Sequence, residues 1–177
     1  MAAARHLRTG ILRMVILGVL LGVASQGGAA QFDLELFAPA RDASRALQAA
    51  HRAKAADLAP RDLQLADLYF ADAAAALNPP SGPPDTEKAA RLFRVAAAAA
   101  KVAETRSVEI VRERDAAAAG NQFLDAIEGD PKRMLPPRPP LAMAQGEYRR
   151  LQQEAAAARA ARRAAEAALE QLRSQVR

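Results

Sequence analysis

The chain has 177 residues, a formal net charge of +5 at pH 7 and 47 alanines, and it contains no cysteine and no tryptophan. This length suits one ordinary domain. Alanine buries little area and only seven residues are Phe or Tyr, so the composition disfavours a deep core around an enclosed substrate pocket. It favours a thin bundle of closely packed helices. The lack of cysteine excludes disulfides, thiolate metal sites and a lipid-modified N-terminal cysteine.

The positive charge is unevenly distributed along the chain. Three arginines lie within residues 1–13, which contain no acidic residue. Residues 31–177 contain 22 basic and 20 acidic side chains, and no stripe of lysine or arginine with interleaved aromatics. This near balance disfavours nucleic-acid binding.

Residues 1–30 have the pattern of a secretory signal peptide. A basic start is followed by an uninterrupted apolar run of 11 residues at 14–24, and the small residues Gly28 and Ala30 suit cleavage after Ala30. The run is shorter than the about 20 apolar residues of an ordinary spanning helix. The sequence therefore predicts an exported protein, periplasmic or envelope-associated. The alternative is an inner-membrane protein anchored by an uncleaved N-terminal segment.

An all-α fold is predicted for the rest of the chain. Residues 31–38 alternate apolar and acidic side chains and are expected to form an extended arm, because a single short strand would have no partner. Residues 39–128 are expected to form an Ala-rich helical domain, a three-helix arrangement with helices at about 40–58, 60–77 and 85–127. Pro60 suits the first turn of the second helix. The Pro-rich loop 78–84 ends that helix, and Asp85 can cap the third helix.

The helical hairpin is expected to close through its few large side chains, whose spacing follows the helical period. These residues are Leu63, Tyr69, Phe70 and Leu77 on one side and Leu92, Phe93 and Ala96 on the other. Gly120 is expected to weaken the third helix near its end.

A Pro-rich linker and a last helix complete the chain. Residues 129–142 contain five prolines between 131 and 140, which predicts a stiff spacer. Residues 143–177 are predicted to form a coiled-coil helix, with an apolar seam from Tyr148 to Val176 that is interrupted by Arg162. Because a stiff linker hinders folding back, we expect a weak homodimer through this seam, with the Arg162 head in solvent. The alternatives are packing on the third helix of the same chain or on another protein.

No residue is predicted to be catalytic, cofactor-binding or metal-ligating, and no cofactor or small-molecule substrate is implied. His51 has no second strong ligand near it in the sequence, and the serines have no evident base. The carboxylates at every fifth position from Asp57 to Asp72 diverge around a helix, because five residues turn it by about 140° beyond a full turn. The acidic residues Asp125, Glu128 and Asp130 are read as a polar helix end.

Three motifs carry a resemblance to a known family. They are an Ala-rich helix ending in a small turn (AADLAP, 55–60), a helix rich in Leu and Ala (DLQLAD, 62–67), and a third helix with KAARLF (88–93). On these motifs, residues 43 to about 118 resemble an exported bacterial family catalogued as domain of unknown function 4398. The long loop 78–84 and the missing lipid-anchor cysteine depart from the family pattern. The resemblance implies a signal sequence and a role in the cell envelope, and no functional residues carry over.

These features together predict a non-enzymatic exported envelope protein with a structural or protein-interaction role and protein partners. The alternative is a periplasmic holdase or assembly factor that holds clients between helical arms. Nucleic-acid binding is the third hypothesis.

Overall fold

In the computed structural model of the chain, the structure describes residue 34 and residues 37–128 and 141–176. The predicted signal peptide, most of the predicted arm and residues 129–140 of the predicted linker lie outside the described residues. The described residues form five helices and no strand, which confirms the all-α class. These helices are α2 (Ala38–Arg52), α3 (Ala55–Leu58), α4 (Pro60–Leu77), α5 (Thr86–Glu128) and α6 (Leu141–Ser174).

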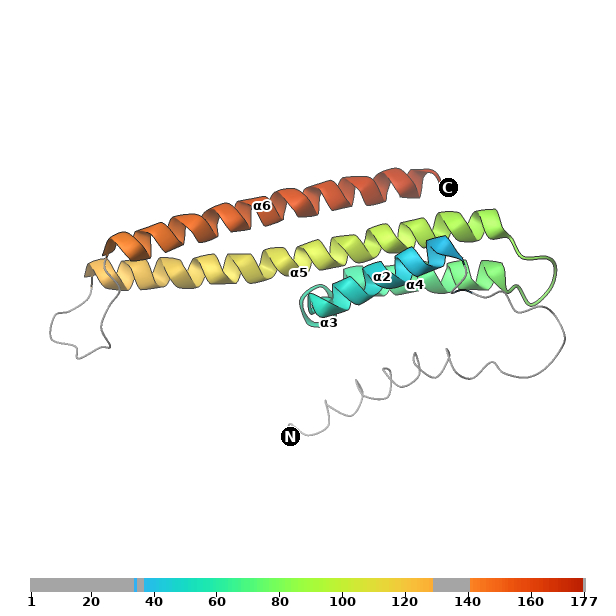
Figure 1. Cartoon of the computed structure of the whole chain (residues 1–177), viewed down its shortest axis with the longest axis horizontal. Coiled ribbons are helices and arrows are strands. Elements are labelled where there is room, and N and C mark those ends of the chain that lie inside the picture. Colours follow the sequence, from blue (N-terminus) through green and yellow to red (C-terminus); the bar gives the residue numbers. More distant parts are fainter. Residues whose placement is uncertain (1–33, 35–36, 129–140, 177) are drawn as a thin grey trace, which may run out of the picture. The chain divides into compact units, whose positions relative to one another are not determined.

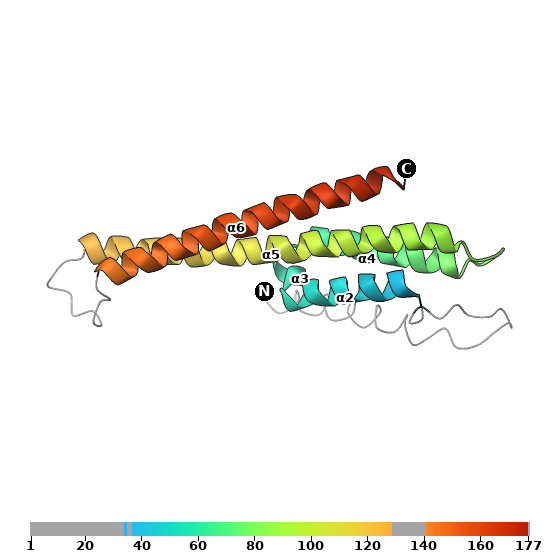
Figure 2. The same ribbon diagram turned by 45° about the horizontal axis from the view of Figure 1, so that its top comes forward.

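The 43-residue helix α5 is the element against which all the others pack. Helices α2, α3 and α4 lie beside its N-terminal part, and α6 runs antiparallel along its length (Figures 1 and 2). The start of α5 is capped as predicted, because the Asp85 carboxylate accepts a hydrogen bond of 2.9 Å from the backbone N–H of Lys88.

The prediction of a single helix at 40–58 is wrong, because the structure has two helices there, α2 and α3. Lys54 adopts a left-handed conformation with φ 59°, and its backbone N–H donates to the carbonyl of His51 at 2.9 Å. Neither glycine nor proline marks this corner in the sequence, and a left-handed lysine costs about 1–2 kcal/mol. The turn brings Ala55 and Ala59 into buried positions, and their packing offsets that cost.

One buried cluster surrounds Phe93, which is fully buried. The Phe70 ring meets the Phe93 ring edge-on with centroids 5.1 Å apart, and the Phe37 ring lies 6.0 Å away on another side. Leu34 also packs against this cluster. The two described residues of the predicted arm that precede the helices are therefore part of the core, and Ala38 already belongs to α2.

A second buried cluster lies further along α5, around Val95 and Val102. Leu63, which we expected beside Phe93, belongs here instead, because α4 runs antiparallel to α5 and its first turn reaches the later turns of α5. The other predicted closing residues lie in the Phe93 cluster or against it, and they are Tyr69, Phe70, Leu77, Leu92 and Ala96.

The expectation that the last helix stays away from the bundle is wrong. Leu169 is buried in the Val95 cluster of α5, and the Tyr148 and Phe123 rings stack at 6.1 Å near the other end of α6. Arg162, expected in solvent, pairs with Glu109 and Glu166. An apolar seam is stabilised wherever it finds a matching face, and α5 presents one within the same chain. Helix α6 also begins at Leu141, two residues before the predicted start.

Helix α5 continues past Gly120 without a break to Glu128, one residue beyond the predicted end at about 127. A Cβ placed on Gly120 would lie 3.1 Å from Cε2 of Tyr148. Glycine is therefore the residue that allows the Tyr148 ring to approach the α5 backbone closely.

Candidate interaction surface

The histidine and the serines considered for chemistry lie in separate places. His51 is exposed at the end of α2. Ser107 is buried, and its hydroxyl donates to the Ala103 carbonyl of its own helix at 2.8 Å. The Ser174 hydroxyl donates to the Gln171 carbonyl in the same way. Within the described ranges, no three His, Asp or Glu side chains gather closely enough to hold a metal ion. The side chains of Asp125, Glu128 and Asp130 fall outside the described residues.

The carboxylates at every fifth position occupy different surroundings. Asp62 pairs with Arg106 of α5 at 3.2 Å, whereas Asp57 and Asp72 are exposed. Asp67 is half-buried, and this burial raises the pKa of its carboxyl, with the nearby His51 acting in the opposite direction. Their separate environments show no shared carboxylate site.

Replacing Asp67 with Asn is expected to raise the melting temperature at pH 7. Its pKa is raised on folding, so the carboxyl favours the folded state at low pH and that contribution is lost as pH rises through the folded pKa. At pH 7 the charged carboxylate is held in a half-buried position, which destabilises the folded state. A neutral amide removes this destabilisation. The advantage over the parent chain should shrink as pH falls toward 4, which parallel thermal melts of the two proteins will measure. A constant difference at all pH values would contradict it.

The part of the bundle beyond α2–α4 is a two-helix arm. This distal arm comprises residues 108–128 of α5 and residues 141–162 of α6, and Figures 1 and 2 show no other described helix beside it. Several large apolar side chains are exposed on it. They are Val108 (41%), Val111 (41%), Leu124 (52%) and Met143 (66%). In the N-terminal part of α5, by contrast, the corresponding apolar positions are covered by α2 and α4.

Ion pairs join α6 to α5 along the arm. Arg112 contacts Glu154 at 3.0 Å, and Arg159 donates from Nε to Glu113 at 2.8 Å. These four side chains are partly solvent-exposed, so each pair contributes at most about 1 kcal/mol. The antiparallel register of the two helices is seen in Phe123, which stacks on Tyr148, and in Glu109, which pairs with Arg162 further along α6.

The most buried ion pair of the described residues lies between these helices. The Glu109 side chain is 10% exposed and pairs with Nε of Arg162, whose side chain is 26% exposed. Arg162 also donates to Glu166 at 2.6 Å. The hydrogen bond to Glu166, helped by Glu109 and opposed by burial, raises the pKa of the Arg162 guanidinium, so this side chain stays charged.

The face of α5 that receives α6 was not identified from the sequence. A signal for it exists, because one stripe of α5 repeats every seven residues as in coiled coils. Its members are Val95, Val102, Glu109, Ala116 and Phe123. This stripe is difficult to recognise in the sequence, because alanine fits the apolar positions of any periodic pattern and long alanine runs lie beside it.

Comparison of the chain with family models, curated proteins and solved structures finds no match. None of the helices in the described part of the chain combines the length and apolar character needed to cross a bilayer.

Proposed function

We propose that the chain is a non-enzymatic, exported envelope protein with a structural or protein-interaction role, and that its distal arm binds a protein partner. The observation that carries this proposal is the set of exposed apolar side chains on the arm, where α6 is the one described helix beside α5. Single exposed apolar residues are common on protein surfaces. Their concentration on a part of the bundle that no other described helix covers favours contact with another protein.

Two of these side chains share one stretch of α5. Val108 and Val111 are three residues apart and therefore neighbours on the helix surface. Two more, Leu124 and Met143, lie on α5 and α6 near the far end of the arm. A partner that covers Val108 and Val111 would bury apolar area at about 25 cal/mol per Å².

A photo-crosslinking experiment tests the proposal. A photoreactive residue at Val111 or Met143 is expected to capture one predominant protein from a bacterial envelope fraction. The matched control is the same residue at Ala75, which is exposed near the C-terminal end of α4, the end that lies beside the start of α5 and away from the arm. Equal capture from the three positions, or none from the arm, would contradict a partner site there.

The alternative function is a periplasmic holdase or assembly factor, favoured by the same exposed side chains on a protruding helical pair. A holdase would crosslink to many unfolded clients through the arm and would suppress aggregation of a denatured test protein. A structural protein would do neither. Nucleic-acid binding is the weakest hypothesis, because arginines such as Arg112, Arg159 and Arg162 are paired with carboxylates.

Homodimerisation remains a proposal, but the surface that would form the dimer differs from the one expected from the sequence. The seam of α6 is occupied by α5 of the same chain, so a dimer would use the exposed arm or an exchange of α6 between two copies. Sedimentation over a range of protein concentrations tests this, and we expect at most weak association.

Export is likewise proposed from the sequence of residues 1–30. N-terminal sequencing of the protein from an envelope fraction is expected to begin at Gln31 or slightly earlier. An intact Met1 on the mature species would favour the uncleaved anchor instead. The resemblance of residues 43–118 to domain of unknown function 4398 supports the same cellular location and is itself a proposal.

A further inference from the structure

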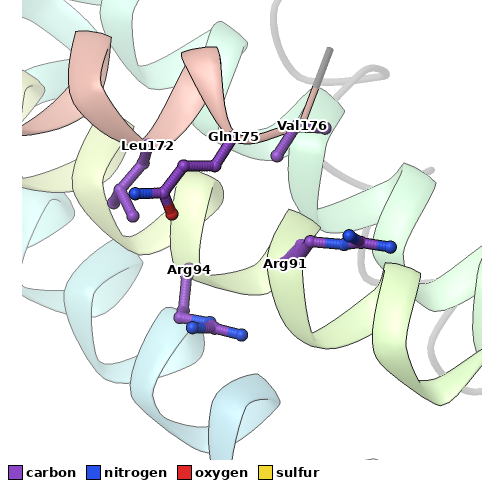
Figure 3. Close-up of a pocket in the computed structure, with 5 residues that line it drawn as sticks. All are labelled: Arg91, Arg94, Leu172, Gln175 and Val176. Carbon is purple, nitrogen blue, oxygen red and sulfur yellow. The ribbon is translucent and has the colours of Figure 1, made fainter.

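The C-terminal end of α6 leaves a groove beside α4 and α5. In both overall views the axes of α6 and α5 separate toward this end (Figures 1 and 2). The groove has a volume of about 330 Å³ and is lined by Tyr69, Val95, Arg173 and Val176. A smaller hollow lies next to it and shares Val176. It is lined by Leu172 of α6, by Gln175 and Val176 just after that helix, and by Arg91 and Arg94 of α5, which Figure 3 labels.

Arg173 is positioned in this groove but has few acceptors. Its guanidinium carbon lies 5.8 Å from the centroid of the Tyr69 ring, a cation–π distance that orients the planar group. Its Nε is buried and has no hydrogen-bond acceptor. The nearest carboxylate contact, to Glu170, is 3.8 Å long, beyond hydrogen-bond distance. A buried donor without an acceptor is unfavourable, and a ligand that supplied an acceptor would remove part of that penalty.

The electrostatic surroundings favour an anion. The residues that line the groove and the hollow include three arginines and no acid. Arg91 contacts Glu87 at 3.4 Å, and Nε of Arg94 donates to the Ala90 carbonyl of its own helix. Glu87 offsets the charge of Arg91, whereas Arg94, bonded to a neutral carbonyl, adds to the positive potential. Arg173 is the guanidinium that lines the larger space.

We propose that this groove binds an oxyanion, a carboxylate or a phosphate, carried on a small apolar body. The planar fork of Arg173 matches the geometry of either anion. Tyr69, Val95 and Val176 provide the apolar wall for the body that carries it. The volume lies at the lower end of small-ligand sites. The proposal does not depend on the partner proposed for the distal arm.

The test is a nuclear magnetic resonance titration of the chain with N-acetyl-leucine, N-acetyl-leucinamide and phenyl phosphate. The amide has the same shape as the acid without its charge. We expect saturable shifts of the Val95 and Val176 methyl signals and of the Arg173 Nε–H signal, with a Kd of about 1–10 mM for an oxyanion. The amide should bind at least about tenfold more weakly, a difference of about 1.4 kcal/mol. Tighter binding of the acid identifies a carboxylate source, and tighter binding of the phosphate ester identifies a phosphate source.

Variants locate the binding at the groove. Arg173→Gln should abolish the shifts, and Arg173→Lys, which keeps the charge but loses the fork, should weaken binding severalfold. Arg163→Gln is the matched control, because it removes the same charge from an exposed position on the same helix. A thermal melt of each variant establishes that it is folded. Equal binding of acid and amide, no saturable shift with any probe, or an equal loss in Arg163→Gln would overturn the proposal.

Discussion

In chemical denaturation, Phe93→Ala is expected to lower the free energy of unfolding by about 3–5 kcal/mol. Phe93 is fully buried at the centre of its cluster, and two aromatic rings pack on it. Alanine would leave a cavity that these neighbours fill only in part. Few other large side chains are buried in this alanine-rich bundle, so the loss is a large share of a stability that for most domains is 5–15 kcal/mol.

The control for this prediction is Leu68→Ala on α4, whose side chain is 57% exposed. It removes a comparable apolar side chain without opening a cavity, and its effect should stay within about 0.5 kcal/mol. An unfolding curve for Phe93→Ala that matches that of Leu68→Ala would show that Phe93 faces water and that the phase of α5 is wrong.

The positions of the helices follow closely from the sequence because their boundaries carry strong local signals. Pro60 begins α4, the proline-rich loop 78–84 separates α4 from α5, and Asp85 caps α5. The period of the apolar residues also predicts the contact between Phe93 and α4. Lys54 shows the limit of such reasoning, because a left-handed lysine is stabilised by the packing of the residues after it and not by its own preference.

The packing of α6 could not be predicted in the same way. Its seam is apolar enough to need a partner, but alanine offers little shape to distinguish one partner from another. The choice of α5 depends on groups that are distant in sequence, such as Glu109 facing Arg162 and Gly120 facing Tyr148. The groove around Arg173 also depends on residues that are distant in sequence, since Tyr69 and Arg173 come together only in the folded chain. In the sequence Tyr69 and Tyr148 look like core or seam residues, but nothing there links Tyr69 to Arg173, Gly120 to Tyr148 or Glu109 to Arg162.

The substitution Arg162→Leu is expected to have opposite effects under the prediction from the sequence and under the structure. From the sequence, leucine would repair an interrupted seam and strengthen helix association. In the structure, the same change leaves the carboxylate of Glu109 between two helices without its guanidinium. We expect the free energy of unfolding to fall by about 1–3 kcal/mol. The fall should be smaller than for a fully buried pair, because Arg162 retains some contact with solvent.

The double variant Glu109→Leu/Arg162→Leu should recover most of that loss, since apolar residues of similar volume often replace a buried ion pair without cost. A double-mutant cycle on unfolding free energies then gives the coupling between the two side chains, expected at about 0.5–3 kcal/mol. The matched control is Arg159→Leu, which breaks a more exposed pair with Glu113 across the same two helices and should change stability by less than about 1 kcal/mol. If Arg162→Leu alone stabilises the chain and the cycle shows no coupling, Glu109 and Arg162 do not meet in solution. The seam of α6 would then be available to a second copy or to another protein.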